Sequence, residues 1–243
     1  MRLFILFILI VTVGSLIQAV IGFGSAVICM AFLPLLFPYS KALALNQAAA
    51  FVGTLLLTIR YFRFIRWKVL VPLLIPTVII GSICTVFSVT VGGTFLFILL
   101  GCVFIVLSVY YLIFAKRIKV KPTAKNGVAM GCLTVLSSGL FGIGGPPAAL
   151  YLLPALQDKT EYMATFQCFF TMLNVVALSI RIGMGSMAAA DMPFVLTGWA
   201  ATFLGTFLGT KIFAGIKSGG FEKLVYVFVG VNGLYIVLSH LFG

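Results

Sequence analysis

The sequence predicts an all-α polytopic membrane protein made of two inverted repeats, each a broken-helix hairpin followed by three transmembrane helices. The first observation is composition: 63% of the 243 residues are hydrophobic and 8% are charged, which lies outside the usage of soluble globular proteins. The second is that glycine-rich segments at residues 22–25 and 141–147 interrupt long apolar runs. The third is that residues of the first half recur in the second half in the same order.

The distribution of charge excludes a nucleic-acid-binding protein. The 16 Lys and Arg residues outnumber the 4 Asp and Glu residues, but they form short clusters between apolar runs and not one basic face. The cysteines lie singly in apolar segments with no histidine beside them, so we expect small buried side chains and no metal site or cofactor. They are Cys29, Cys84, Cys102, Cys132 and Cys168.

The first long apolar run, residues 3–37, is too long for one membrane helix. At ~1.5 Å per residue it would be about 50 Å long, against a hydrocarbon core of ~30 Å. We therefore expect it to fold back as a hairpin with its tip at the glycines, which leaves residues 25–37 as a half-helix. Arg2 before this run resembles the start of a signal peptide, but the same arrangement recurs in mid-chain, so we expect the segment to be mature structure. Three spans follow, at residues 42–59, 69–87 and 94–114.

The second half repeats this order of elements. A run at residues 127–156 is broken at the second glycine-rich segment, and its last part, residues 146–156, is again too short to span. Three spans follow at residues 161–180, 192–214 and 223–242. Matching residues lie 120 positions apart and, after a slip of one residue, 121 apart: Gly22 and Gly142, Gly24 and Gly144, Pro34 and Pro154, Gln47 and Gln167, then Arg60 and Arg181. We therefore predict a first repeat at residues 1–115, a basic connector at 116–125 and a second repeat at 126–243.

Basic residues predict the orientation of the spans. Clusters at residues 60–68, 116–125 and 211–223 are expected in the cytoplasm, and the uncharged connection at residues 88–94 is expected outside. The first hairpin must then begin and end outside, and the second must begin and end inside. The two repeats are therefore predicted to be inverted, with both termini outside, although Arg2 goes mildly against the rule.

The two breaks are the predicted substrate site. Irregular backbone inside a membrane must be buried in protein or line a wet cavity, and a helix N-terminus there presents free N–H groups that suit an anion. We expect Ser25 to be the N-cap of the first half-helix, and Pro146 and Pro147 to form the first turn of the second. Close packing of helices at glycine is the alternative. The backbone site residues are Gly22, Phe23, Gly24, Ser25, Gly142, Ile143, Gly144, Gly145 and Pro146.

Polar side chains on two spans are predicted to complete the site. Gln47 and Thr54 are seven residues apart, as are Gln167 and Asn174, so each pair lies on one face of its helix. We predict that Gln47, Gln167 and Asn174 bind substrate; hydrogen bonding between helices is the alternative. Asn46 has no polar counterpart and is a weaker candidate.

Two arginines are predicted to act as entry gates for an anion. Arg60 and Arg181 end equivalent helices on opposite sides of the membrane, although arginines that only extend to the interface are commoner there. The acidic residues fall at loops or helix ends, so the carboxylate relay typical of cation and proton transport is missing. This pattern favours an anionic substrate.

The duplicated break with its short proline-containing helix, at residues 141–153 and 22–34, resembles the TauE/SafE family of sulfite and organosulfonate exporters. The resemblance covers nearly the whole chain and implies export of a small sulfur-containing anion from the bacterial cytoplasm. The first break departs from the second in having Ser25 for Gly145 and Ala26-Val27 for Pro146-Pro147. Because the prolines should hold their half-helix rigidly, we expect the second break to matter more.

The leading hypothesis is therefore a multi-pass transporter of the cell inner membrane that exports sulfite or a sulfonate, not an enzyme. Its expected partners are the small anion and the lipid bilayer, with a second copy in a homodimer left open, and no nucleic acid is expected. The alternatives are an intramembrane serine hydrolase with Ser25 as nucleophile and a non-transporting assembly or sensor subunit. Ser25 lacks the Gly-x-Ser-x-Gly context, and the single histidine, His240, is near the end of the chain. Electrical drive alone and coupling to a proton or sodium ion are both left open.

Overall fold

The chain is helical throughout the part that the structure describes. The computed structural model describes residues 2–21, 24–91, 93–110, 112, 120–156 and 158–213, and short pieces between residues 227 and 238. Its membrane-length apolar helices number five, so the chain is a multi-pass membrane protein. The spans are Arg2–Ala19, Tyr39–Arg60, Trp67–Thr90, Lys159–Gly183 and Ala189–Gly209.

Both long apolar runs are broken at the predicted glycines. Helix α1 (Arg2–Ile21) is followed by the short helix α2 (Ser25–Phe32), which continues as η1 (Leu33–Leu35). In the second half, α7 (Ala124–Phe141) is followed by α8 (Gly145–Ala155). In each hairpin the short helix packs against the long one before it. Gly22 and Phe23, at the first break, lie outside the described residues.

The remaining helices are the spans that follow each hairpin. In the first half they are α3 (Tyr39–Arg60), the continuous run of α4 (Trp67–Pro76), η3 (Thr77–Gly81) and α5 (Ser82–Thr90), and α6 (Gly93–Val109). The short helix η2 (Phe62–Phe64) precedes α4. In the second half they are α9 (Lys159–Gly183) and, after η5 (Ala189–Asp191), α10 (Met192–Phe213). A π-helical turn at η3 follows Pro76, which fits the loss of a backbone N–H donor at proline.

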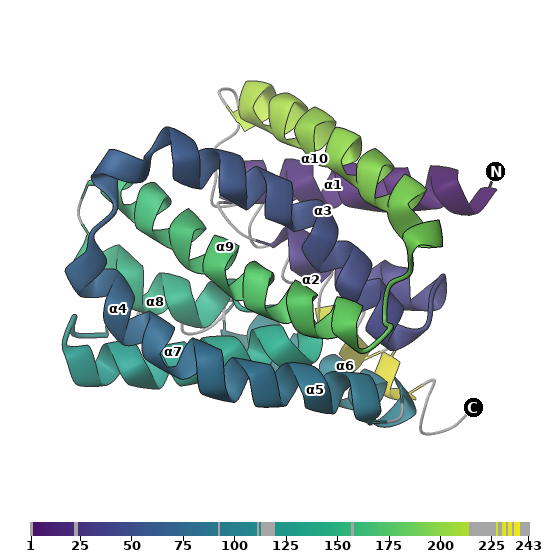
Figure 1. Cartoon of the computed structure of the whole chain (residues 1–243), viewed down its shortest axis with the longest axis horizontal. Helices are drawn as coiled ribbons and strands as arrows, with labels where there is room; N and C mark the ends of the chain where they lie inside the picture. Colours follow the sequence, from purple (N-terminus) through teal and green to yellow (C-terminus); the bar gives the residue numbers. More distant parts are fainter. Residues whose placement is uncertain are drawn as a thin grey trace.

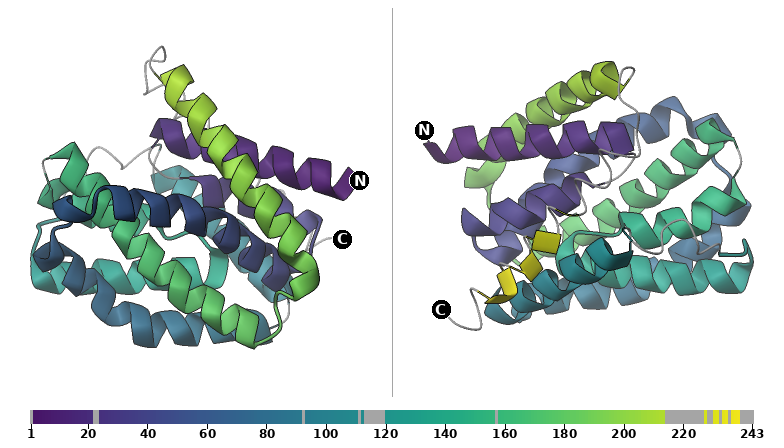
Figure 2. Two further views of the ribbon diagram at one scale, coloured as in Figure 1. Left: turned by 45° about the horizontal axis from the view of Figure 1, so that its top comes forward. Right: turned by 180° about the vertical axis from the view of Figure 1, so that it is seen from behind.

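The helices are arranged in layers. Figures 1 and 2 show α1 and α10 side by side along one edge, α3 and α9 in the middle, and α4, α5 and α7 along the opposite edge. Many large apolar side chains on these helices are exposed, among them Leu9, Ile79 and Phe207, as expected of a surface that faces lipid. The middle pair is therefore the part of the molecule best shielded from the membrane.

Helices α1 and α10 approach each other closely through small residues. Gly205 and Gly209 lie four residues apart on α10, which is the spacing of a small-residue interface between membrane helices. A Cβ atom at Gly209 would lie 2.6 Å from the carbonyl oxygen of Leu16. Only glycine allows this approach, so the start of the chain is held against a helix of its second half.

Helices α3 and α9 are antiparallel and joined by buried polar contacts. The hydroxyls of Thr58 and Thr171 are 3.0 Å apart, and Arg181 Nε donates to Gln47 Oε1 at 2.9 Å. Residue numbers fall along α9 as they rise along α3, so the two helices run in opposite directions. This pair carries the amide side chains of the predicted site.

Candidate functional site

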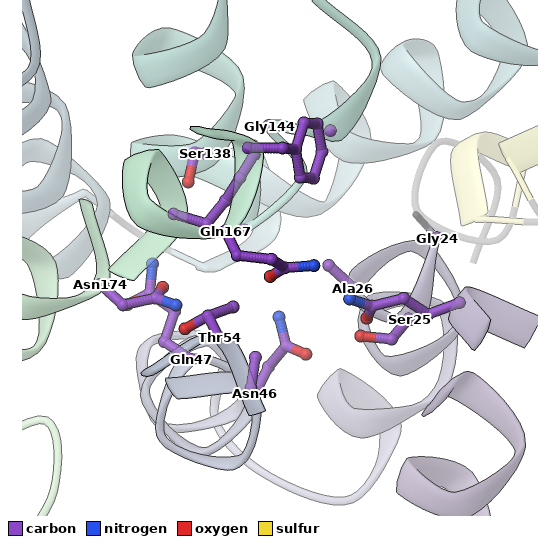
Figure 3. A pocket seen from close by; sticks show the side chains of 16 residues that line it. Gly24, Ser25, Ala26, Asn46, Gln47, Thr54, Ser138, Gly144, Gln167 and Asn174 are labelled. Atoms are coloured by element: carbon purple, nitrogen blue, oxygen red, sulfur yellow. The ribbon is translucent and has the colours of Figure 1, made fainter. Parts of the chain in front are cut away.

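A cavity of about 70 Å³ lies where the two hairpin breaks meet α3 and α9. A water molecule needs roughly 10–15 Å³ of such space, so the cavity has room for a small oxyanion. Figure 3 shows its polar side chains, with Ser25 on the side of α2 and amide groups from α3 and α9. The lining residues are Gln18, Gly24, Ser25, Ala26, Asn46, Gln47, Ala50, Thr54, Ser138, Gly142, Gly144, Gly145, Phe166, Gln167, Phe170 and Asn174.

Most of the predicted site residues line this cavity. Gly24, Ser25, Gln47, Gly142, Gly144, Gly145, Gln167 and Asn174 do so. Two others do not: Ile143 packs into an apolar core cluster, and Pro146 is buried in the first turn of α8. Gly22 and Phe23 lie outside the described residues, so their predicted place in the site remains a prediction.

The lining also contains residues that sequence reasoning missed or ranked low. Asn46 was a weak candidate, and Gln18, Ser138, Phe166 and Phe170 were not proposed. The repeat spacing was the signal that could have found them, because most lining residues pair with another at a distance of 120 positions. The pairs are Gln18 with Ser138, Gly24 with Gly144, Ser25 with Gly145, Asn46 with Phe166, Gln47 with Gln167, Ala50 with Phe170, and Thr54 with Asn174.

The first turn of α2 offers more free backbone donors than that of α8. The earliest helical hydrogen bond of α2 runs from Ile28 N to Gly24 O at 3.2 Å, so the N–H groups of residues 25–27 are free of the helix ladder. In α8 the second and third positions are Pro146 and Pro147, which have no N–H. The first turn of α8 therefore has fewer free N–H donors than that of α2, and which break matters more for transport remains a prediction.

The N-cap residue of α2 differs from the sequence prediction. Gly24 occupies this position with φ of 116°, and no side-chain hydrogen bond caps the helix. Ser25, expected to be the N-cap, is instead the first helical residue, and it is buried beside the cavity. A left-handed backbone at the cap position favours glycine, which explains why the serine is displaced by one position.

At α8 the corresponding glycine is needed for a different reason. Gly144 has φ of −104°, which any residue can adopt. A Cβ atom there would lie 2.9 Å from Ser138 Cβ and 3.0 Å from Thr134 Cγ2. The break thus presses against α7, and the space for a side chain is missing.

The gate arginines occupy different environments. Arg60 is exposed at the end of α3, and its guanidinium lies 5.5 Å from the centre of the Tyr61 ring. Arg181 is 0% exposed, so the alternative that it extends to the membrane interface is wrong. Its burial follows from packing of α9 against α3 and α5 and from the contact of its guanidinium with the Gly139 carbonyl on α7, and its role as a gate remains a prediction.

Arg181 belongs to a set of groups that satisfy the C-terminal end of α7. The last carbonyls of a helix have no partner within it, and here the carbonyls of residues 137–140 accept hydrogen bonds from groups beyond the helix end or on other helices. Gly142 takes a left-handed conformation with φ of 74°, as is common after a helix. The bonds run from Ile143 N to Ser137 O at 3.3 Å, Gly142 N to Ser138 O at 2.8 Å, Arg181 Nη2 to Gly139 O at 2.8 Å, and Tyr39 Oη to Leu140 O at 2.8 Å.

The acidic residues that the structure describes are all engaged away from the cavity. Asp158 caps α9 by accepting from the backbone N–H groups of residues 160 and 161. Glu161 pairs with Arg66, and Asp191 pairs with Lys41 at 2.6 Å. Among the described residues no group of three or more His, Cys, Asp or Glu side chains is placed to hold a metal ion. The polar side chains that line the cavity are therefore amides and hydroxyls.

Comparison with known proteins gives one match. Residues 6–236 match the family model described as sulfite exporter TauE/SafE. No curated protein matches the chain. No solved structure matches it.

Proposed function

This chain belongs to the sulfite exporter TauE/SafE family, and we propose that it exports sulfite or an organosulfonate through the cavity between its two helix breaks. Proteins of this family are membrane transporters and not enzymes. The proposed substrate is an anion with several acceptor oxygens. The groups around the cavity are therefore expected to replace the water molecules that such an anion loses on entry.

The donor chemistry of the cavity is the observation that carries this proposal. The first-turn N–H groups of α2 lie at one side, and the amides of Gln47, Gln167 and Asn174 lie at the other. None of the lining residues that the structure describes carries a carboxylate. The lining amides and hydroxyls supply both donors and acceptors, but no described lining residue offers a negative charge to a cation, whereas an oxyanion would find donors and the positive end of a helix dipole.

The pairing of lining residues supports a duplicated transporter with inverted halves. Both halves contribute a break and a polar helix, and the polar helices, α3 and α9, are antiparallel. In transporters with inverted repeats, substrate sites lie where the repeats meet, and the repeats move against each other to expose the site alternately to each side. We infer that the paired residues are the two half-sites of this arrangement.

The membrane potential supplies a driving force for export. A negative interior favours outward movement of an anion by about 2.3 kcal/mol per charge per 100 mV. The described acidic residues are all engaged in caps and ion pairs, so none of these carboxylates is placed at the cavity as a proton carrier. At equal substrate concentrations on the two sides, electrical drive alone gives net export of an anion, and coupling to an ion would add to it.

Flux in sealed proteoliposomes tests the proposal. Vesicles loaded with sulfite should release it faster with the protein than without it, and release should quicken when the loaded side is made electrically negative. Matched vesicles loaded with sodium or a small amine serve as the control for charge selectivity. Saturable movement of the cation with no response to sulfite would contradict the proposal.

A further inference from the structure

Arg181 and Gln47 form a buried polar pair beside the cavity whose hydrogen bonding is incomplete. The two residues are 0% and 3% exposed. Arg181 donates through Nε to Gln47 Oε1 and through Nη2 to the carbonyl of Gly139. Arg181 Nη1 and Gln47 Nε2 have no hydrogen-bond partner in the part of the chain that the structure describes. Two buried N–H donors are thus left without an acceptor, at a cost that a bound acceptor would remove.

Arg181 decides which way the Gln47 amide faces. A guanidinium can only donate hydrogen bonds, so the amide must present its oxygen to Arg181. The amide nitrogen then points away from the guanidinium, and Gln47 lines the cavity. In this orientation Gln47 offers N–H donors to whatever occupies the cavity.

The positive charge of Arg181 has no carboxylate to balance it among the described residues. Glu161 is paired with Arg66, Asp191 is paired with Lys41, and Asp158 caps α9. A buried charge without a counter-charge is costly, and proteins usually pair such a group. A bound anion is the partner that this environment lacks.

We propose that Arg181 is a positioning residue for anion selectivity, which holds the Gln47 amide with its N–H groups toward the bound anion and supplies the balancing positive charge. This proposal rests on the proposed function, which makes the cavity an anion site. In this proposal Arg181 determines anion selectivity from a buried position and does not act as an entry gate at the membrane surface. The oxygen of a sulfite-like anion accepts from Gln47 Nε2, whereas a cation is repelled by the positive charge of Arg181 and finds no carboxylate among the described lining residues.

Substitution Q47E is the first test, because it keeps the shape of the side chain. The new carboxylate pairs with Arg181, so the protein should fold with unchanged yield and an equal or higher thermal unfolding midpoint. The donor facing the cavity is lost and the positive charge is neutralised. We expect the dissociation constant for sulfite, measured by calorimetry on purified protein, to rise roughly 10- to 100-fold or more.

Substitution R181M, alone and combined with Q47E, tests the link between the two residues. R181M should weaken sulfite binding by a similar factor. The double variant should bind sulfite no more weakly than Q47E alone, because both substitutions disrupt the same Arg181–Gln47 pair. The matched control is T58V, which deletes a buried polar contact between the same two helices, to Thr171 at 3.0 Å. It should lower the unfolding midpoint and leave the dissociation constant unchanged.

The outcomes separate this inference from the proposed function. If wild-type protein binds sulfite and Q47E binds it equally well, the inference is overturned and the exporter proposal stands. If wild-type protein binds chloride but not sulfite, sulfate or methanesulfonate, and Q47E loses chloride, the inference stands and the substrate proposal fails. R181M that lowers stability without changing anion affinity would make Arg181 a structural cap of α7 only.

Discussion

The two glycines at equivalent positions of the breaks, Gly24 and Gly144, are required for different physical reasons. Gly24 needs its left-handed backbone, with φ of 116° and open space around a Cβ atom, the nearest contact being Ile17 at 3.8 Å. Gly144 has an ordinary backbone and no space. A side chain at Gly144 would have no room, because Ser138 and Thr134 already fill that volume.

Alanine at each position should destabilise the protein for its own reason. G24A forces a side chain into the left-handed region, which costs roughly 1–2 kcal/mol. G144A overpacks the contact with α7, which costs typically 1–3 kcal/mol. Both effects can be measured as a fall in the free energy of unfolding in detergent. A G24A variant as stable as wild type would show that the break does not hold the backbone described here.

The sequence and the structure agree on the amides and disagree on Arg181. Seven-residue spacing was enough to place Gln47 and Gln167 on inward faces, since periodicity reports a helix face directly. Arg181 ends a long apolar helix, and such a position usually lies at the interface. In its buried position Arg181 donates to the carbonyl of Gly139, which is 42 residues away in the sequence. A contact between residues so far apart cannot be predicted from the local sequence pattern.

At the scale of elements, the C-terminal end of α7 depends on partners from α3 and α9. The hydroxyl of Tyr39 donates to the carbonyl of Leu140 at 2.8 Å, and Arg181 satisfies the neighbouring carbonyl. These bonds tie the tip of the second hairpin to both helices of the middle layer. The position of the break is therefore fixed by the spans around it.

Removal of the tyrosine hydroxyl should loosen this attachment. Y39F leaves the Leu140 carbonyl without its donor, and an unsatisfied group of this kind costs about 1–3 kcal/mol. We expect the free energy of unfolding to fall by that amount, with faster hydrogen exchange at the end of α7. Y162F is the matched control, because the hydroxyl of Tyr162 has no hydrogen bond to the residues that the structure describes, and it should leave both measurements near those of wild type.

The breaks also show which part of an element can be predicted from sequence. The helix ends at residues 21 and 141 follow from glycine and proline chemistry, and the structure has them at those residues. Which of the two breaks matters more remains a prediction, because proline stiffness and proline's missing N–H have opposite effects on an anion site. The count of free donors favours α2, and only the observed cap at Gly24 made that count possible.

For the whole molecule, the predicted topology is open to direct measurement. In a cysteine-free background, K121C should react with a membrane-impermeant maleimide only from the cytoplasmic side, because its loop belongs to a basic cluster. T90C, at the end of α5, should react only from outside. Both positions are exposed. External labelling of K121C would reverse the orientation and remove the argument for inverted halves.

The close contact between α1 and α10 has a consequence for biosynthesis. Helix α1 precedes α10 in the chain and is translated earlier, so the glycine face that it packs against, at Gly205 and Gly209 on α10, is made only after α2 to α9. Until then α1 has its hairpin partner α2 but not α10. A nascent chain stalled before α10 should therefore remain sensitive to membrane quality-control proteases, and insertion of α10 should stabilise the position of α1.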